Sequence, residues 1–193
     1  MRKFSESTFN THKLATMGVM AGLSVVLVVF IHFPIFPQAT FLEYDPADVP
    51  ILIVTFAYGP LAGLIVTVVA SLVQGLTVSA HSGIYGILMH VISTGSYVLT
   101  AGIIYKLLHS RLGAGIAIFS GVLVSAAVMA AANLVITPMF LGTPVEVVKA
   151  MLIPVIIPFN LIKSGINGVM TFLLYKPITR YFQIKSAEVK LNN

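Results

Sequence analysis

A lysine inside a long apolar stretch is the feature that most constrains how this chain can fold. Lys163 lies in a mainly apolar region from Val145 to Leu174. A lysine at the centre of a lipid bilayer costs roughly 2.5–3.5 kcal/mol, so it is expected at a functional site or near a helix end. In a helix that begins near Pro158, Asn160 and Asn167 share one face with Lys163. We favour a polar ligand site inside a helical bundle; the alternative is a lysine that reaches out to the lipid headgroups.

The low content of charged residues indicates an integral membrane protein. Charged residues make up 9% of the 193 residues and hydrophobic residues 58%, whereas soluble domains carry about 25% charged residues. The length allows about five to seven helices of about 20 residues each in one compact bundle. The chain contains no cysteine, which excludes disulfides, thiolate metal sites and cysteine nucleophiles.

The apolar segments predict an all-α fold, a compact bundle of six transmembrane helices. The expected helices span residues 14–33, 49–58, 61–78, 84–109, 114–137 and 158–182. The helix at 49–58 is too short to span a bilayer alone, since it would be about 15 Å long. Residues 34–50 are rich in proline and carboxylates and should form a loop outside the hydrocarbon. Residues 138–144 should form a second loop, and a short amphipathic piece at 145–152 should precede the last helix. The domains expected are an N-terminal segment at 1–13, a membrane domain at 14–182 and a disordered tail at 183–193.

The basic residues predict the orientation in the membrane. With six helices both termini lie on one side, and nine of the eleven Lys and Arg residues fall on that side: Arg2, Lys3, Lys13, Lys106, Arg111, Lys176, Arg180, Lys185 and Lys190. The positive-inside rule makes this side, and both termini, cytoplasmic. The layout then brings the loop at 34–50, Asn133 and the segment 158–163 together in the outer half, as a binding site requires.

The polar groups available favour ligand recognition over catalysis. The sequence lacks metal-ligand spacing, a nucleophile motif and a phosphate-binding loop. It offers amides, one buried cation, hydroxyls and aromatic faces, which suit a flat heteroaromatic ligand with a hydroxylated tail. His90, Ser93, Thr94 and Tyr97 share one helix face and either line a cavity or bond to other helices.

Three segments in order resemble the riboflavin-specific S components of energy-coupling factor (ECF) vitamin transporters. They are FLEYDPADVPILIVTFAYGPLAG (41–63), NLVITP (133–138) and IPFNLIKSGIN (157–167). The resemblance covers nearly the whole chain from Lys13 to Phe182. It implies a six-helix protein in the bacterial plasma membrane that captures riboflavin from outside. It also implies a transmembrane coupling subunit and two cytoplasmic ATPases as partners, with riboflavin as substrate and no cofactor.

Carried over by position, the resemblance implies a set of vitamin contacts. The expected contacts are Leu42, Tyr44, Asp45, Asn133, Asn160 and Lys163. Further candidates are Phe41, Tyr85, His90, Tyr97, Thr137 and Asn167. Asp45 precedes a proline, so an alternative role for it is to cap the following turn.

Gly18 and Gly22 occupy the position where the family's first helix docks on the coupling subunit. Their spacing permits close approach of another helix, and packing within the bundle is the alternative. For the function as a whole, the alternatives are an S component for another vitamin and a stand-alone facilitator. A membrane enzyme or a scaffold is disfavoured, because catalytic groups are lacking and Lys163 is costly to bury.

Overall fold

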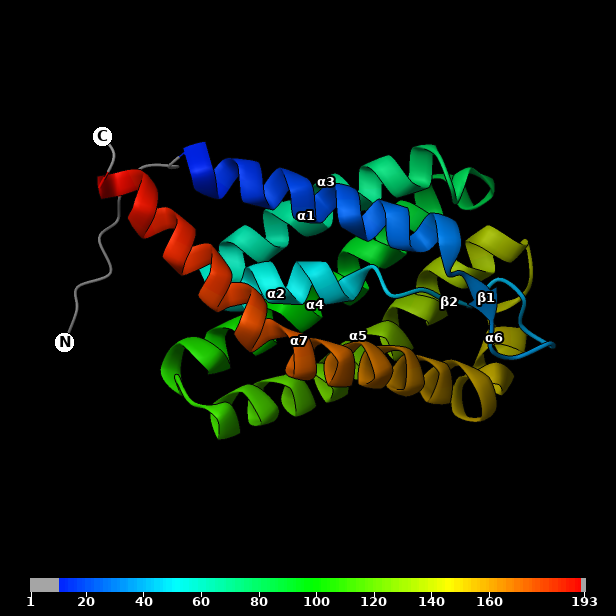
Figure 1. Ribbon diagram of the computed structural model, residues 1–193. Coiled ribbons are helices and arrows are strands. Elements are labelled where there is room, and N and C mark those ends of the chain that lie inside the picture. The colour runs from blue at the N-terminus through cyan, green and yellow to red at the C-terminus, as the bar shows by residue number, and fades with distance from the viewer. Residues whose placement is uncertain (1–10, 192–193) are drawn as a thin grey trace.

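The helices form an elongated bundle. The computed structural model describes residues 11–191, with side chains up to Arg180. The helices are α1 (Thr11–Phe30), α2 (Asp48–Tyr58), α3 (Pro60–Leu76), α4 (Gly83–Leu107), α5 (Arg111–Leu141), α6 (Val145–Met151) and α7 (Ile157–Leu191). A 3₁₀ turn at Ala80–Ser82 precedes α4, and a wider π turn at Leu152–Ile156 joins α6 to α7. Figure 1 shows the long helices running side by side along the bundle.

The helical prediction is confirmed at the level of fold class. Four helical segments in the described residues are long and apolar enough to cross a membrane: Thr11–Phe30, Ala80–Leu107, Arg111–Leu141 and Val145–Arg180. The helices α2 and α3 are apolar but shorter. Gly59 separates α2 from α3 with a φ of 94°, a conformation that glycine adopts without strain.

The ends of three helices differ from the sequence prediction. Helix α1 ends at Phe30 instead of residue 33, and Phe33 belongs to a short strand. Helix α5 does not stop at 137 but continues through Pro138 to Leu141, and Gly142 in the left-handed conformation ends it. The proline removes only one helical hydrogen bond near that end. Helix α7 continues to Leu191 instead of ending near 182. The predicted N-terminal segment falls mostly on residues 1–10, outside the described residues, as do the side chains of the tail.

The predicted loop at 34–50 contains a small hairpin. Strand β1 (Phe33–Pro34) pairs antiparallel with β2 (Glu43–Tyr44), with Phe33 opposite Tyr44. Their rings lie 5.4 Å apart between centroids. The hairpin therefore holds the two ends of the loop together at the end of the bundle where α6 also lies (Figure 1).

Close contact between α4, α5 and α7 depends on small residues. Tyr97 of α4 is almost completely buried, and a Cβ atom added to Gly121 of α5 would overlap its ring. A Cβ atom on Gly168 of α7 would overlap the Tyr97 hydroxyl. Small residues let helices pack closely in this way, and they leave room for the Tyr97 side chain to reach from α4 to α7.

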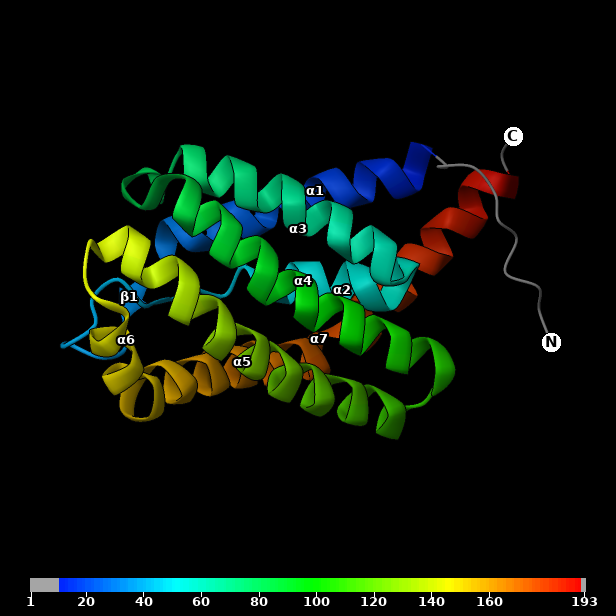
Figure 2. The same ribbon diagram turned by 180° about the vertical axis from the view of Figure 1, so that it is seen from behind.

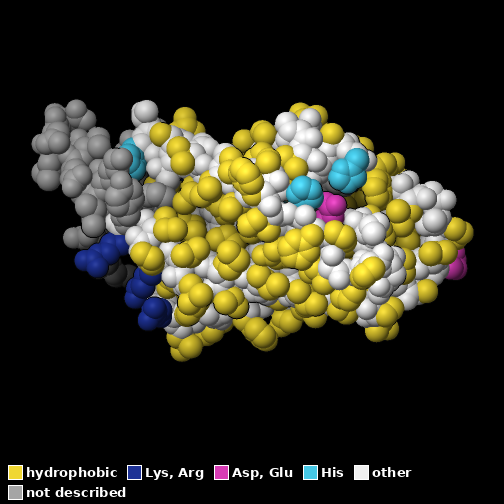
Figure 3. All heavy atoms as spheres, turned by 45° about the vertical axis from the view of Figure 1, so that its right-hand side comes forward, with side chains coloured by type: hydrophobic (Ala, Val, Ile, Leu, Met, Phe, Trp, Pro, Cys, Tyr) yellow, Lys and Arg dark blue, Asp and Glu magenta, His cyan; other side chains and the backbone are white. Residues whose placement is uncertain are grey.

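Charge is distributed unevenly along the bundle. The beginning of α1 and the end of α7 lie at the same end in both ribbon views (Figures 1 and 2). Figure 3 shows a face covered mainly by apolar side chains, with Lys and Arg gathered near one end. The acidic side chains visible on this face lie away from that end.

Candidate ligand-binding site

A cavity lies between the hairpin loop and helices α3, α4, α5 and α7. It encloses about 930 Å³ of empty space, including the part that is open to solvent. Nine of the twelve residues predicted as ligand contacts line it: Phe41, Leu42, Asp45, Tyr85, His90, Asn133, Thr137, Asn160 and Lys163. The segments predicted to converge from distant parts of the sequence therefore do meet around one cavity.

Two asparagines present amides on the α5 and α7 side of the cavity. Asn133 Nδ2 donates to the Met129 carbonyl oxygen at 2.8 Å, and Asn160 Nδ2 donates to the Ile156 carbonyl oxygen at 2.8 Å. Each bond runs back one helical turn and fixes the orientation of the side chain. Since an amide nitrogen carries two hydrogens, each asparagine keeps a second donor.

Lys163 forms an ion pair with the loop. Its Nζ lies 2.6 Å from Asp45 Oδ2 and donates to the Glu43 carbonyl oxygen at 3.3 Å. Both side chains are largely buried, with 15% and 6% of their surface exposed. This geometry contradicts the alternative in which the lysine reaches out to headgroups. The other oxygen of Asp45 accepts from the Ala47 N–H at 3.0 Å, so Asp45 also caps the turn, as its position before proline indicated.

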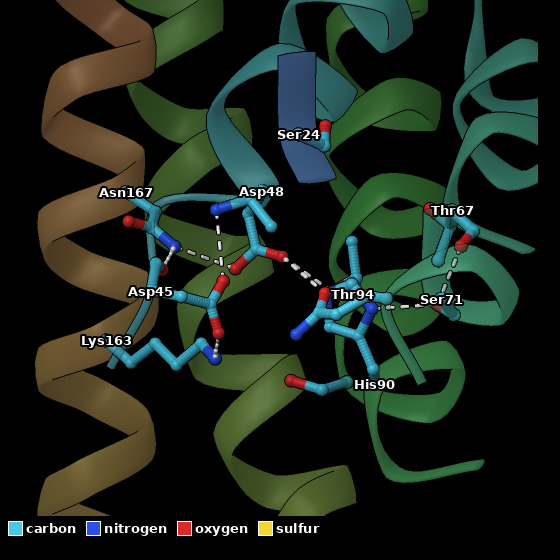
Figure 4. Close-up of polar contacts among 12 residues, drawn as sticks. Ser24, Asp45, Asp48, Thr67, Ser71, His90, Thr94, Lys163 and Asn167 are labelled. Atoms are coloured by element: carbon cyan, nitrogen blue, oxygen red, sulfur yellow. Dashed lines mark hydrogen bonds and ion pairs between the residues drawn. The ribbon is translucent and has the colours of Figure 1, made fainter. Parts of the chain in front are cut away.

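Asp48 is the centre of a second polar cluster, which the sequence analysis did not identify as functional. Its carboxylate accepts from Thr94 Oγ1 at 2.6 Å and from Asn167 Nδ2 at 2.9 Å. His90 Nε2 lies 3.6 Å from the same carboxylate. Figure 4 shows Asp48 between α7 and α4, next to the pair formed by Asp45 and Lys163. Asp48 thus connects the start of α2 to two other helices.

The cluster continues through His90 to α3. The Ser71 hydroxyl lies 2.8 Å from His90 Nδ1 and donates to the Thr67 carbonyl oxygen at 2.6 Å. Figure 4 places Lys163 and Ser71 on opposite sides of this cluster. His90 and Ser71 both line the cavity, so a continuous set of polar contacts runs beside it from α7 to α3.

Apolar and aromatic side chains cover much of the remaining cavity surface. Phe41 and Leu42 come from the loop and Phe159 from α7. Tyr85 of α4 lies 5.9 Å from Phe140 of α5 between ring centroids. Aromatic and aliphatic surfaces of this kind suit a flat ring, while the amides and Lys163 supply directional hydrogen bonds.

Three predicted contacts do not line the cavity but support it. Tyr97 donates to the Ser164 carbonyl oxygen at 3.2 Å. The Tyr44 hydroxyl donates to Asn167 Oδ1 at 3.1 Å, and Asn167 Nδ2 donates to the Asp45 carbonyl oxygen at 3.0 Å. Burial raises the pKa of the Tyr44 hydroxyl, which keeps it in the donating form. All four residues of the polar stripe on α4 contact other helices, but only His90 and Ser93 also line the cavity.

Several cavity residues were missed by sequence reasoning. Gln74 and Ser79 line the cavity from α3 and the turn after it, together with Met89, Met129 and Ile136. A glutamine in the otherwise apolar segment 61–78 was a usable signal, because buried amides need partners. For Asp48, the signal was an acid directly before the apolar run 49–58.

These features define a membrane-embedded ligand-binding protein: a cavity in an apolar bundle that is partly open to solvent, with amides, a paired cation and aromatic surfaces. No group of three or more His, Asp and Glu side chains in the described residues could hold a metal ion. The sequence profile of the family described as "ECF transporter, substrate-specific component" matches residues 12–175. The chain therefore belongs to this family, as the sequence resemblance indicated, and is a multi-pass membrane protein and a transport subunit.

Two bacterial proteins are similar over most of the chain. The riboflavin transporter RibU of Staphylococcus aureus (strain TCH60) is 29% identical over 177 residues, covering 89% of this chain and 92% of the relative. The riboflavin transporter FmnP of Bacillus subtilis (strain 168) is 26% identical over 171 residues, covering 84% and 90%. A solved structure of the S component of a bacterial ECF transporter aligns with a TM-score of 0.76 and 30% identity, over 88% of this chain and 96% of that one.

Proposed function

We propose that this protein is a riboflavin-binding S component, which captures the vitamin at the outer face of the membrane. The two relatives described as riboflavin transporters support this substrate, since both align over most of their length. The family supports the division of labour, with uptake driven by a coupling subunit and ATPases that this chain does not contain.

The observation that carries the proposal is the meeting of Asn133, Asn160 and Lys163 around one cavity with aromatic side chains. Riboflavin has a flat tricyclic ring with two carbonyl oxygens, an imide N–H and ring nitrogens that accept hydrogen bonds. Amides can bond both to the imide and to the carbonyls, while an ammonium donates only to acceptors. Phe41, Leu42 and Phe159 provide surfaces against which such a ring can pack.

We further propose six membrane crossings, by α1 to α5 and α7, with both termini in the cytoplasm. Lys106 and Arg111 flank the turn between α4 and α5, and Lys176 lies far along α7. The common end of α1 and α7 and the basic side chains near it support this orientation. Residues 1–13 and 183–193 would then be cytoplasmic segments around the membrane domain.

Helix α1 offers a surface for the coupling subunit. Gly18 and Gly22 are exposed, and a Cβ atom on either would meet nothing within 4 Å. These glycines are therefore not used for packing among the described residues, which favours a partner helix over packing within the bundle.

The function can be tested with detergent-purified protein. Riboflavin should bind with quenching of its fluorescence, and protein purified from cells should carry a flavin absorption spectrum. Thiamine, biotin and folate serve as controls and should not compete. Saturable binding of one of these vitamins without riboflavin binding would support the alternative of an S component for another vitamin. Uptake of riboflavin in cells that lack the ATPases would support the facilitator instead.

A further inference from the structure

The side of the cavity formed by α3 and α4 differs in chemistry from the side formed by α5 and α7. Its polar groups are mainly hydroxyls, with one amide and one imidazole: Ser71, Gln74, Ser79, Ser82, His90 and Ser93. The opposite side holds the asparagines, Lys163 and Phe159. A ring that bonds to the second side leaves the hydroxyl-rich side for another part of the ligand.

Two side chains on this side, His90 and Gln74, have a buried atom without a hydrogen-bond partner. His90 Nε2 lies 3.6 Å from the Asp48 carboxylate, so the less well paired of the two is Gln74. Its side chain is buried, with 9% of the residue exposed. Its Nε2 lies 3.4 Å from Ser79 Oγ, a long hydrogen bond, and its Oε1 has no hydrogen-bond partner. Buried polar groups are normally paired, and an unpaired carbonyl destabilises the protein.

Turning the amide over does not remove this deficit. If the oxygen and nitrogen of Gln74 exchange places, Ser79 can donate to the oxygen, but the amide hydrogens then lack an acceptor. The terminal torsion of glutamine is soft, so the amide can rotate toward the cavity. A ligand hydroxyl would complete either arrangement, because a hydroxyl both donates and accepts.

We propose that Gln74 is a specificity residue that hydrogen-bonds to the polyhydroxylated tail of the ligand. The inference rests on the proposed riboflavin function and assigns the two ends of the vitamin. The ring lies toward α5 and α7, and the ribityl chain extends along α3 and α4. Figure 4 shows Lys163 and Ser71 on opposite sides of the polar cluster around Asp48.

The test compares riboflavin with lumiflavin, which has the same ring and a methyl group in place of the ribityl tail. Gln74→Met keeps the length of the side chain and removes its polar atoms. The dissociation constant for riboflavin should rise about tenfold, as expected for a buried hydrogen bond. The dissociation constant for lumiflavin should change less than twofold. Unchanged lumiflavin binding also shows that the variant is folded. Thr67→Val, on the same helix but outside the cavity, should change neither constant.

Each outcome separates this inference from the function on which it rests. If wild-type protein binds neither flavin, the proposed function fails. If wild type binds both and Gln74→Met weakens neither, or weakens both equally, the function stands and the role of Gln74 is refuted. If Gln74→Met does not fold, Gln74→Glu is used instead, because it keeps the acceptor oxygens. This variant should preserve the wild-type ratio of the riboflavin and lumiflavin affinities within threefold. A larger change in that ratio overturns the inference.

Discussion

Removing the charge of Lys163 should affect binding and stability by separate routes. Of its three N–H donors, two are directed to Asp45 Oδ2 at 2.6 Å and to the Glu43 carbonyl oxygen at 3.3 Å, which leaves one for a ligand. Loss of a charge-assisted hydrogen bond costs about 1.5–3 kcal/mol, or about 10- to 150-fold in the dissociation constant. We therefore expect Lys163→Met to weaken riboflavin binding by at least tenfold.

The same substitution leaves Asp45 buried without its cation. Breaking a buried ion pair in this way costs about 3–5 kcal/mol of stability. Weaker riboflavin binding by the single variant could therefore come either from the lost contact or from the lost stability. The double variant Asp45→Asn, Lys163→Met removes both charges and should recover most of the stability. Thermal unfolding followed by circular dichroism measures this, because the chain has no tryptophan.

Binding to the double variant decides between the two roles. If Lys163 donates to the vitamin, fluorescence titration should show riboflavin binding that remains at least tenfold weaker, even though the protein is stable again. Asp45→Asn alone completes the double-mutant cycle. Recovery of wild-type affinity in the stable double variant would refute the contact, since Lys163 would then act only by neutralising Asp45.

Three further predictions follow from the contacts. Gly18→Leu should leave riboflavin affinity unchanged but reduce co-purification with the coupling subunit; loss of flavin binding with normal assembly would contradict a docking role. Tyr44→Phe removes a bond behind the cavity, so amide exchange in residues 33–44 should rise while the dissociation constant changes less than threefold; a larger change would place Tyr44 in contact with the vitamin. Asp48→Ala removes the acceptor of the Thr94 hydroxyl and one of the two acceptors of the Asn167 amide, so it should lower the unfolding temperature more than Glu43→Ala does; equal effects would remove Asp48 from the centre of the cluster.

The position of the site was predictable because buried charge and amides are costly in a membrane. Lys163 and Asn160 stand out in an apolar segment for that reason, and the structure brings both to the cavity with Asn133. The all-α fold class and the approximate bounds of the long helices followed from the length of the apolar segments. The end of α5 could not be predicted from apolar length. Tertiary contacts let the helix continue through Pro138, because the proline removes only one helical hydrogen bond.

The division between cavity residues and supporting residues could not be read from the sequence. Tyr85 and Tyr97 carry the same side chain on one helix, but Tyr85 lines the cavity whereas Tyr97 packs against glycines of α5 and α7. Which of them meets a ligand depends on the rotation of α4 against its neighbours. Asp48 was missed for a related reason: a carboxylate in an acidic, proline-rich stretch looks solvated until helix packing encloses it.

The ion pair between Asp45 and Lys163 has a consequence for the free energy of ligand binding. An isolated ammonium would keep its water shell, and an arriving ligand would have to remove that shell before it could bond. Here two of the three N–H groups of the ammonium already bond to the loop in the folded protein, and the carboxylate holds the ammonium in place beside the cavity. The desolvation of these two groups is therefore not subtracted from the free energy of vitamin binding. A site whose donor is already in position loses less free energy to ordering when the ligand arrives.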